Sequence, residues 1–308
     1  MIQAQATYNL LMIRPVQFKF NEETASSNAF QDASAHELQP SLTQADALRE
    51  FDEMANRLKS AGVNVIVFDD VADSYSPDSI FPNNWISFHE NGDVVLYPMF
   101  AENRRAERRE DILDILEDEG FVINEIMDYT SAEEDNVFLE GTGSLLLDRE
   151  NGKAYCALSP RADEELMIEF CEDFEFTPVI FEAFQTVNGE RKQIYHTNVM
   201  LTLGDTFAVI CADCIDDKKE RKMVLDSLRG DDKEVVLITE EQVNNFAGNM
   251  LEVKGKDDKR YLVMSESAYK SLTKKQLAQL EAHVEIIHSS LDTIEACGGG
   301  SARCMMAE

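Results

Sequence analysis

One pattern recurs four times along the 308-residue chain: a polar residue, an apolar strand, a short polar turn, a second apolar strand and then a helix. The strands that open these units begin at residues 85, 144, 199 and 250. Two of the turns contain Asn-Gly and one contains Gly-Asp. Such pairs tolerate positive φ and favour tight β-hairpins. The repeat therefore restricts the chain to architectures in which equivalent units pack side by side.

Each predicted hairpin precedes a helix and one more strand. Helical periodicity predicts helices over 102–120, 163–174, 216–230 and 267–282. A fifth helix over 42–62 is followed by a strand but has no hairpin of its own, unless the two ends of the chain pair. We therefore predict an α/β fold, a five-bladed α/β propeller of pseudo-fivefold ββαβ units whose fifth unit is closed by both termini.

The repeat runs from end to end, so we expect a single domain over 1–308. The alternative is two α/β domains that divide near residue 150. No stretch rich in proline, glycine and serine marks a linker there, which favours the single domain.

Charge and hydropathy exclude several classes of protein. The chain has 59 Asp and Glu against 28 Lys and Arg, a net charge of −31, which disfavours nucleic acid and anionic membranes as partners. No segment approaches the roughly 18 apolar residues of a membrane span. Six cysteines are too few for a disulfide framework, and the first residues lack the pattern of a leader. We expect a cytoplasmic protein with a small-molecule partner, either a monomer or a homo-oligomer.

In a ring of such units, the polar residues at the start of each first strand meet near the axis. They are Asn83, Asn84, Glu140, His196, Asn198, Asn249 and Cys304. This set contains a thiol, an imidazole and a carboxylate, the parts of a nucleophilic centre. Taken singly, each has a structural alternative: a free Cys is usually a small buried apolar group, and a buried Glu can belong to an ion pair.

Five segments carry a resemblance to a known family, in the family's order. They are FPNNW (81–85), FLEGTGSLLL (138–147), LSPRAD (158–163), YHTNVM (195–200) and CGGGSARCMM (297–306). They resemble the guanidine-modifying (pentein) superfamily of arginine and agmatine deiminases, amidinotransferases and succinylarginine dihydrolase. LMIRPVQFKFNEETASSNAFQ (11–31) is most similar to the arginine-deiminase-related citrulline-utilisation hydrolases, or citrulline ureidases.

The resemblance implies roles for individual residues. It implies that Cys304 is the nucleophile, that His196 is the general acid and base, and that Glu140 orients the imidazole. It also implies that Arg161 holds the substrate carboxylate. Substrate contacts are further expected at Asn83, Asn84, Asn198 and Asn249, although Asn249 could equally cap a loop. Arg14 is either a second anchor or a structural ion-pair partner.

Asn84 and Asn198 stand where arginine deiminases have two aspartates against the guanidinium. A guanidinium offers only donors, whereas a ureido group also offers a carbonyl acceptor, which an asparagine amide can match. This departure favours citrulline as the substrate, cleaved through a covalent S-carbamoyl intermediate without metal or cofactor. The alternatives are a deiminase, dihydrolase or amidinotransferase acting on arginine or a derivative, and a non-catalytic binding protein of the same fold.

Three other features are given structural interpretations. Cys297 is a weaker candidate for the nucleophile and is expected to pack in the interior. The CxxC of Cys211 and Cys214 has no second ligand pair at zinc spacing, which disfavours a zinc or redox site. The basic run within 102–110 is expected to lie in a helix and to form pairs with its glutamates four residues apart.

Overall fold

The computed structural model describes residues 4–32, 34, 40–71 and 76–308. Within this part of the chain, four three-stranded sheets share one topology: an antiparallel hairpin, then a third strand parallel to the hairpin's second strand. Their strands are β3 (Ile86–Phe88), β4 (Asp93–Leu96), β5 (Glu125–Asp128), β6 (Leu145–Asp148), β7 (Lys153–Leu158), β8 (Thr177–Glu182), β11 (Leu201–Leu203), β12 (Phe207–Ile210), β13 (Glu234–Leu237), β14 (Leu251–Lys254), β15 (Arg260–Ser265) and β16 (Glu285–Ser289). The repeat predicted from the sequence is present.

A fifth unit combines the two ends of the chain. Strand β1 (Asn9–Arg14) pairs in parallel with β2 (Asn64–Asp69). On its other side, Leu11 forms an antiparallel bridge with Ala307, with backbone hydrogen bonds of 2.9 and 3.0 Å. The segment around Ala307 therefore pairs with β1 as the sequence suggested, through a single bridge rather than a full strand.

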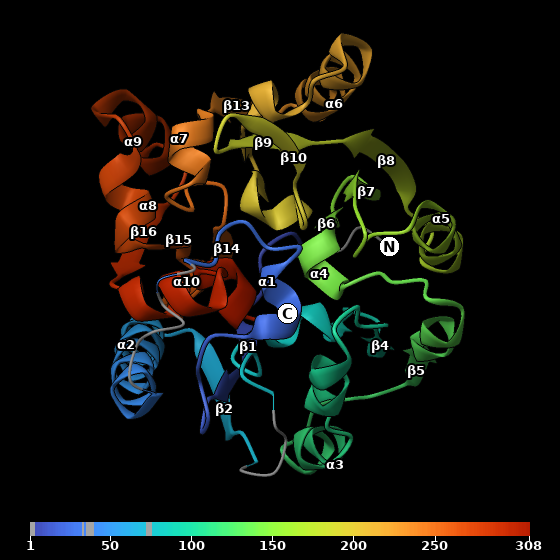
Figure 1. The fold of residues 1–308 in the computed structure, drawn as a ribbon, viewed down its shortest axis with the longest axis vertical. Helices are drawn as coiled ribbons and strands as arrows, with labels where there is room; N and C mark the ends of the chain where they lie inside the picture. The colour runs from blue at the N-terminus through green and yellow to red at the C-terminus, as the bar shows by residue number, and fades with distance from the viewer. Residues whose placement is uncertain (1–3, 33, 35–39, 72–75) are drawn as a thin grey trace.

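The helices divide into an outer and an inner group. Figure 1 places α2, α3, α5, α6 and α9 at the outside, and α1, α4 and α10 close to the centre. The α-helices are α1 (Glu22–Ala25), α2 (Pro40–Ser60), α3 (Asp111–Asp118), α4 (Gly141–Ser144), α5 (Glu164–Asp173), α6 (Lys218–Gly230), α7 (Glu240–Val243), α8 (Glu266–Ser271), α9 (Lys274–Glu281) and α10 (Asp292–Gly298). The 3-10 helices are η2 (Pro82–Asn84), η3 (Glu102–Glu107), η4 (Thr130–Asp135), η5 (Thr197–Val199), η6 (Ala212–Cys214), η7 (Lys256–Asp258) and η8 (Ala302–Met305).

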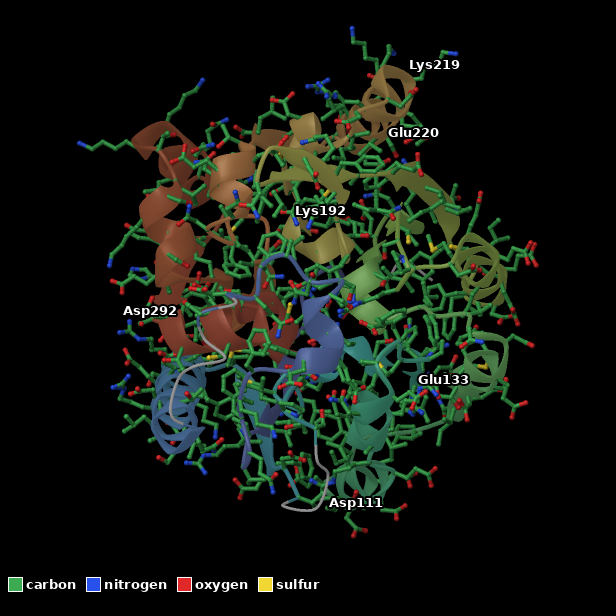
Figure 2. The ribbon with its side chains drawn as sticks, in the orientation of Figure 1. Asp111, Glu133, Lys192, Lys219, Glu220 and Asp292 are labelled. Carbon is green, nitrogen blue, oxygen red and sulfur yellow. The ribbon has the colours of Figure 1, made fainter. Side chains whose placement is uncertain are left out.

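Apolar side chains fill the space between the sheets and the outer helices. In one cluster, Val224 and Leu228 of α6 are buried with Val209 of β12 and Val236 of β13. Lys219 is exposed on the outer side of α6, whereas Glu220 lies toward β8, where its carboxylate accepts the backbone N–H of Glu182 at 2.8 Å (Figure 2). Among the described residues, no helix has the length and apolar character that a membrane crossing requires.

Two predicted helices are interrupted. The helix expected over 102–120 is instead η3 followed by α3, with Arg108 in an extended conformation between them (φ −67°, ψ 110°). The break lets Arg108 reach Glu133 at 2.6 Å, whereas a continuous helix would leave the basic run in solvent. The helix expected over 267–282 divides into α8 and α9, because Thr273 starts a new helix with a capping box to Gln276.

One hairpin was not predicted. Strands β9 (Phe184–Val187) and β10 (Glu190–Gln193) form a separate two-stranded sheet before the third repeat. Asn188 and Gly189, both at positive φ, form its turn. The Asn-Gly pair is a hairpin signal that the repeat pattern passed over.

The first strand of a repeat is preceded by a short helical turn in three of the four sheets. These turns are η2, α4 and η5, and η8 takes the same place before the strand near Ala307. A helical turn reverses the chain at the inner end of each sheet, so it projects polar side chains toward the centre rather than along the strand. The turns η2, α4, η5 and η8 contact one another and form the framework of the candidate site.

Candidate active site

His196 and Glu140 form a buried pair at the inner ends of two neighbouring sheets. His196 Nε2 lies 2.7 Å from Glu140 Oε2, and the two side chains are 1% and 0% exposed. His196 and Cys304 line the same small cavity. The three residues expected to be catalytic, although far apart in sequence, therefore come together: two line the cavity, and Glu140 bonds one of them from behind.

Glycines in the GTG segment make this approach possible. A Cβ on Gly143 would lie 2.8 Å from His196 Nδ1 and 2.4 Å from Asn84 Nδ2. Gly141 adopts φ +44°, and a Cβ there would lie 2.3 Å from the Asn83 carbonyl oxygen. Side chains at these positions would push η2 and His196 away from α4. The two glycines therefore allow these three segments to pack in direct contact.

The buried charges around Glu140 fix its protonation state and that of His196. Burial raises the pKa of Glu140, but Arg161 and the bond to His196 bring it below its usual range. Burial lowers the pKa of His196 to about 4, reinforced by Arg161 and Arg104, while Glu140 opposes the shift. At neutral pH the pair is therefore an ionised carboxylate and a neutral imidazole, the form that can accept a proton from a thiol.

This electrostatic balance predicts the acid side of the pH profile. We expect kcat/KM to fall with an apparent pKa below 6.5, because His196 takes up its proton only as the pH drops toward about 4. Folding stability should also decline below pH ~6.5, since the unfolded chain binds that proton more readily than the folded one. Initial rates measured on enzyme shown to be folded at each pH would check this. An acid limb at or above ~6.5 would contradict it.

The thiol of Cys304 faces two asparagine amides. Asn249 Nδ2 lies 3.3 Å from Cys304 Sγ, and Asn198 Nδ2 lies 3.5 Å from it. Asn249 Oδ1 accepts the backbone N–H of Arg303 at 3.0 Å, which turns its NH2 group toward the sulfur. Amide donors directed at sulfur stabilise a thiolate, the nucleophilic form. Asn198 and Asn249 thus lie against the Cys304 thiol, and neither is among the residues that line the cavity.

The remaining predicted residues differ in where they lie. Asn84 and Arg161 line the cavity. Asn83 lies behind them, accepting a hydrogen bond from Asn84 Nδ2 at 3.2 Å, and it is not among the residues that line the cavity. Arg14 is a structural partner, since it pairs with Asp52 at 2.8 Å and with Asp69 at 3.5 Å.

The cysteines outside the centre have structural surroundings. Cys297 is fully buried in an apolar cluster, and burial raises its pKa to about 11. Cys211 and Cys214 are buried beside the turn η6. No group of three or more metal-ligating side chains occurs among the described residues.

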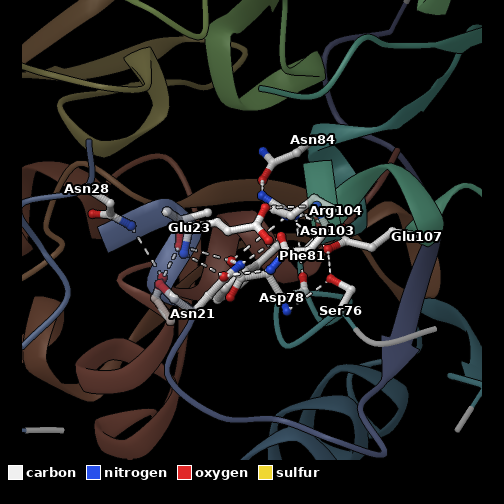
Figure 3. Close-up of polar contacts among 12 residues, drawn as sticks. Asn21, Glu23, Asn28, Ser76, Asp78, Phe81, Asn84, Asn103, Arg104 and Glu107 are labelled. Atoms are coloured by element: carbon white, nitrogen blue, oxygen red, sulfur yellow. Dashed lines mark hydrogen bonds and ion pairs between the residues drawn. The ribbon is translucent and has the colours of Figure 1, made fainter. Parts of the chain in front are cut away.

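Arg104 is a site residue that the sequence analysis missed and misplaced. It is only 2% exposed, and its Nε and Nη2 donate to Glu107 at 2.9 and 2.8 Å. Its Nη1 donates to Asn84 Oδ1 at 2.8 Å (Figure 3). The pairing is with Glu107, three residues on, in a 3-10 turn, so the periodicity of an α-helix gave no signal for it.

Asp78 is a second residue that sequence reasoning missed. It lines the cavity, and its Oδ2 accepts from Asn21 Nδ2 at 2.7 Å and from Thr24 Oγ1 at 3.3 Å (Figure 3). Its Oδ1 is buried without a hydrogen-bond partner among the described residues. Burial raises the pKa of Asp78, with Arg104 opposing. An acceptor of this kind is available to a cationic group of a ligand.

The segment around α1 covers the cavity. Arg161 Nη2 donates to Ser27 Oγ at 2.6 Å and to the Thr24 carbonyl at 3.3 Å. Asn28 Nδ2 donates to the carbonyls of Gly298 and Gly299, each at 3.3 Å. The cavity left beneath has a volume of about 10 Å³. A small-ligand pocket occupies roughly 300 Å³ or more, so the described conformation leaves no room for a small-molecule ligand in this cavity.

Comparison with known proteins places the chain in a family. The model of the family described as N,N dimethylarginine dimethylhydrolase, eukaryotic, matches residues 14–308. The chain belongs to this family. Its superfamily is the guanidino-modifying, or pentein, superfamily, and the protein is a hydrolase acting on carbon–nitrogen bonds. No curated protein matches the chain.

Solved structures share the fold at low identity. An arginine dihydrolase of the ornithine–ammonia cycle in cyanobacteria, ArgZ, in its apo form, has a TM-score of 0.74 at 16% identity, covering 97% of this chain and 40% of that one. The N-terminal domain of ArgZ bound to product has a TM-score of 0.72 at 18% identity, covering 97% of this chain and 96% of that one. A variant dimethylarginine dimethylaminohydrolase, in an adduct with S-methyl-L-thiocitrulline, has a TM-score of 0.66 at 14% identity, covering 97% of this chain and 98% of that one.

These matches confirm a mixed α/β pentein fold over nearly the whole described chain. The chain spans about 40% of the length of full-length ArgZ and nearly all of its N-terminal domain. The matched family is described by the hydrolysis of dimethylarginine, and ArgZ is described as an arginine dihydrolase.

Proposed function

We propose that this enzyme is a cysteine-dependent hydrolase that removes the ureido group of citrulline or a close relative, giving ornithine, carbon dioxide and ammonia. The orientation of the Asn84 amide is the observation that carries this proposal. Arg104 can only donate, so the Asn84 atom 2.8 Å from it must be the carbonyl oxygen. The NH2 group then lies on the other side, near Gly143 and His196.

An amide donor at this position suits a ureido carbonyl. A guanidinium has five N–H donors and no acceptor, so a donor aimed at it is repelled. The amides of Asn198 and Asn249 likewise offer donors beside Cys304. Glu140, the nearby carboxylate, is already bonded to His196, Arg161 and the backbone N–H of Phe100. These surroundings favour a neutral reacting group over a cationic one.

The cavity also carries groups that match an amino acid head. Arg161 and Arg104 line it as permanent cations, and Asp78 lines it as a carboxylate. Arg161 lies beneath the rings of Tyr195 and Phe100, 5.0 and 5.8 Å from their centroids, and its Nε is buried without a partner among the described residues. We assign the α-carboxylate of the substrate to the arginines and its ammonium to Asp78.

Arginine or a methylated arginine is the second candidate substrate, and the comparisons favour it. The description of the family names dimethylarginine as the molecule that its members hydrolyse. One similar structure, a variant of AgrE, is a binary complex with L-arginine. An enzyme that hydrolyses a guanidino group in two stages passes through a ureido stage, so donors such as Asn84 would serve its second half. In both candidate reactions, on citrulline and on arginine, the nucleophile would be Cys304.

The mechanism uses the residues already placed. His196 takes the proton of Cys304, and the thiolate forms a C–S bond at the ureido carbon. The C–N bond to the ornithine side chain breaks as His196 returns the proton to the departing nitrogen. Water, deprotonated by His196, then hydrolyses the S-carbamoyl intermediate, which restores the thiol and releases carbamate. Carbamate decays to carbon dioxide and ammonia.

Product analysis separates the candidates. We expect purified enzyme to form ornithine and ammonia from citrulline with a kcat/KM at least ~10-fold above that for arginine or dimethylarginine, because the Asn84 donor discriminates between carbonyl and amidinium. Amino acid chromatography and ammonia release measure the products. Citrulline formed from arginine, or dimethylamine formed from dimethylarginine, with citrulline left unchanged, would establish the second candidate instead.

A single variant tests the observation directly. Asn84→Asp keeps the contact with Arg104 but replaces the donor by an acceptor, so the preference for citrulline over arginine should fall by at least ~10-fold. Asn56→Asp, at an exposed position on α2, is the control for the same change of charge away from the cavity. An unchanged preference in Asn84→Asp would remove the basis of the ureido assignment.

A further inference from the structure

Glu295 is a buried carboxylate outside the cavity that the mechanism does not use. It lies on α10 and is 7% exposed. Each of its two carboxylate oxygens accepts a hydrogen bond from a serine hydroxyl. Ser301 Oγ donates to its Oε1 at 2.5 Å, and Ser267 Oγ donates to its Oε2 at 2.6 Å. Ser267 in turn contacts Ser265 Oγ at 2.8 Å, at the start of α8.

Ser301 leads directly to the nucleophile. It precedes η8, and its carbonyl oxygen accepts the backbone N–H of Cys304 at 3.0 Å. The Glu295 carbonyl accepts the N–H of Gly299 at 2.9 Å, where the chain adopts φ +64° and α10 ends. Glu295 therefore holds the turn between α10 and Cys304 twice, through its backbone at Gly299 and through its side chain at Ser301.

The glycines of this turn need such support. Gly298, Gly299 and Gly300 have no side chains to pack, and glycine gives up more backbone freedom on ordering than any other residue. The position of Cys304 Sγ relative to the Asn249 and Asn198 amides, at 3.3 and 3.5 Å, depends on the path of these glycines. A displacement of about 1 Å at a reacting atom can cost on the order of 100-fold in rate.

We propose that Glu295 is a positioning residue for the reaction, acting through the Ser301 side chain to set the nucleophile's turn against the two asparagine amides, with Ser267 and Ser265 anchoring the carboxylate to α8. The proposal rests on Cys304 being the nucleophile. It does not depend on which substrate is hydrolysed, because none of these contacts is made by a side chain assigned to bind the substrate.

Two side-chain deletions test the clamp formed by Glu295, Ser267 and Ser301. Ser301→Ala and Glu295→Ala should each lower kcat by about 10- to 100-fold while KM stays within about twofold, since the binding groups are untouched. Glu295→Gln should recover most of the rate, because its amide oxygen still accepts from Ser301 and its NH2 can donate to Ser267 Oγ. Glu281→Gln, an exposed carboxylate on α9, is the control for charge removal.

A second readout needs no substrate. The rate at which iodoacetamide alkylates Cys304 should differ several-fold between Ser301→Ala and wild type. In Glu295→Gln this rate should stay near the wild-type value. Mass spectrometry of the C-terminal peptide follows the alkylation. A purely structural role would lower the melting temperature without changing kcat or alkylation in the folded protein. If Glu295→Ala does not fold, Ser301→Ala alone decides.

Unchanged kcat and unchanged alkylation in the folded Ser301→Ala variant would overturn the inference. This failure is distinct from that of the proposed function. Wild-type enzyme that leaves citrulline intact would refute the substrate, while the alkylation comparison would still report on the clamp.

Discussion

Replacing Cys304 with alanine should reduce kcat by on the order of 10⁴-fold or more, with the enzyme still folded and able to bind substrate. Alanine removes the atom that forms the covalent bond to the substrate carbon, so what remains is the contribution of binding and the amide donors. The side chain is only 3% exposed and contacts Asn249 and Asn198, so the substitution leaves a small void rather than a charge. Steady-state kinetics and a binding titration with citrulline measure both effects.

The matched control is Cys297→Ala. This cysteine is seven residues upstream and fully buried, but belongs to the apolar cluster rather than to the cavity, so its loss should lower the melting temperature and leave kcat within about twofold. Wild-type enzyme quenched during turnover should carry an adduct on the peptide that contains Cys304. Turnover surviving in Cys304→Ala, or an adduct on another cysteine, would refute the assigned nucleophile.

Glu140→Gln should lower kcat by roughly 10³- to 10⁴-fold, the magnitude seen when the acid that orients a catalytic imidazole is neutralised. The amide cannot stabilise the imidazolium that forms when His196 takes the thiol proton. It also leaves Arg161, 3.4 Å away and 2% exposed, without its anionic partner. The loss should appear in kcat and in kcat/KM, and the acid limb should move to lower pH, because Glu140 is the group that raises the pKa of His196.

Glu241→Gln, an exposed carboxylate on α7, is a suitable control because it changes net charge equally without touching the cavity. Circular dichroism must show that the Glu140 variant is folded before its rate is interpreted. A folded Glu140→Gln enzyme within tenfold of wild type would mean that His196 is positioned by other contacts.

The repeat allowed the topology and the main candidate site residues to be predicted. Hairpin turns, apolar strands and amphipathic helices each have a recognisable local pattern. Their order along the chain was therefore enough to predict the ββαβ units and the pairing of the two ends of the chain, seen at Leu11 and Ala307. The same order put Cys304, His196 and Glu140 at equivalent inner positions. Their proximity follows from topology and not from any contact that a short motif could reveal.

What the sequence could not predict depends on burial of charge. Arg104 belongs to a run of arginines and glutamates that suggests a solvated helix, yet it is enclosed with Glu107 and contacts Asn84. Asp78 and the segment around α1 lie between repeats, where the pattern makes no statement. Whether such groups turn inward is decided by hydrogen bonds to distant residues, and local periodicity carries no information about those.

The bridge between Leu11 and Ala307 also constrains how the enzyme is made. The sulfur that would attack the substrate lies three residues before that bridge, so a nascent chain holding the first four repeats would already have its imidazole and acid but no reactive centre. Bringing together segments nearly three hundred positions apart is slow and entropically costly. Catalysis should therefore require that the segment around Cys304 has paired with β1, and a cut near position 300 would abolish activity while leaving most of the sheets intact.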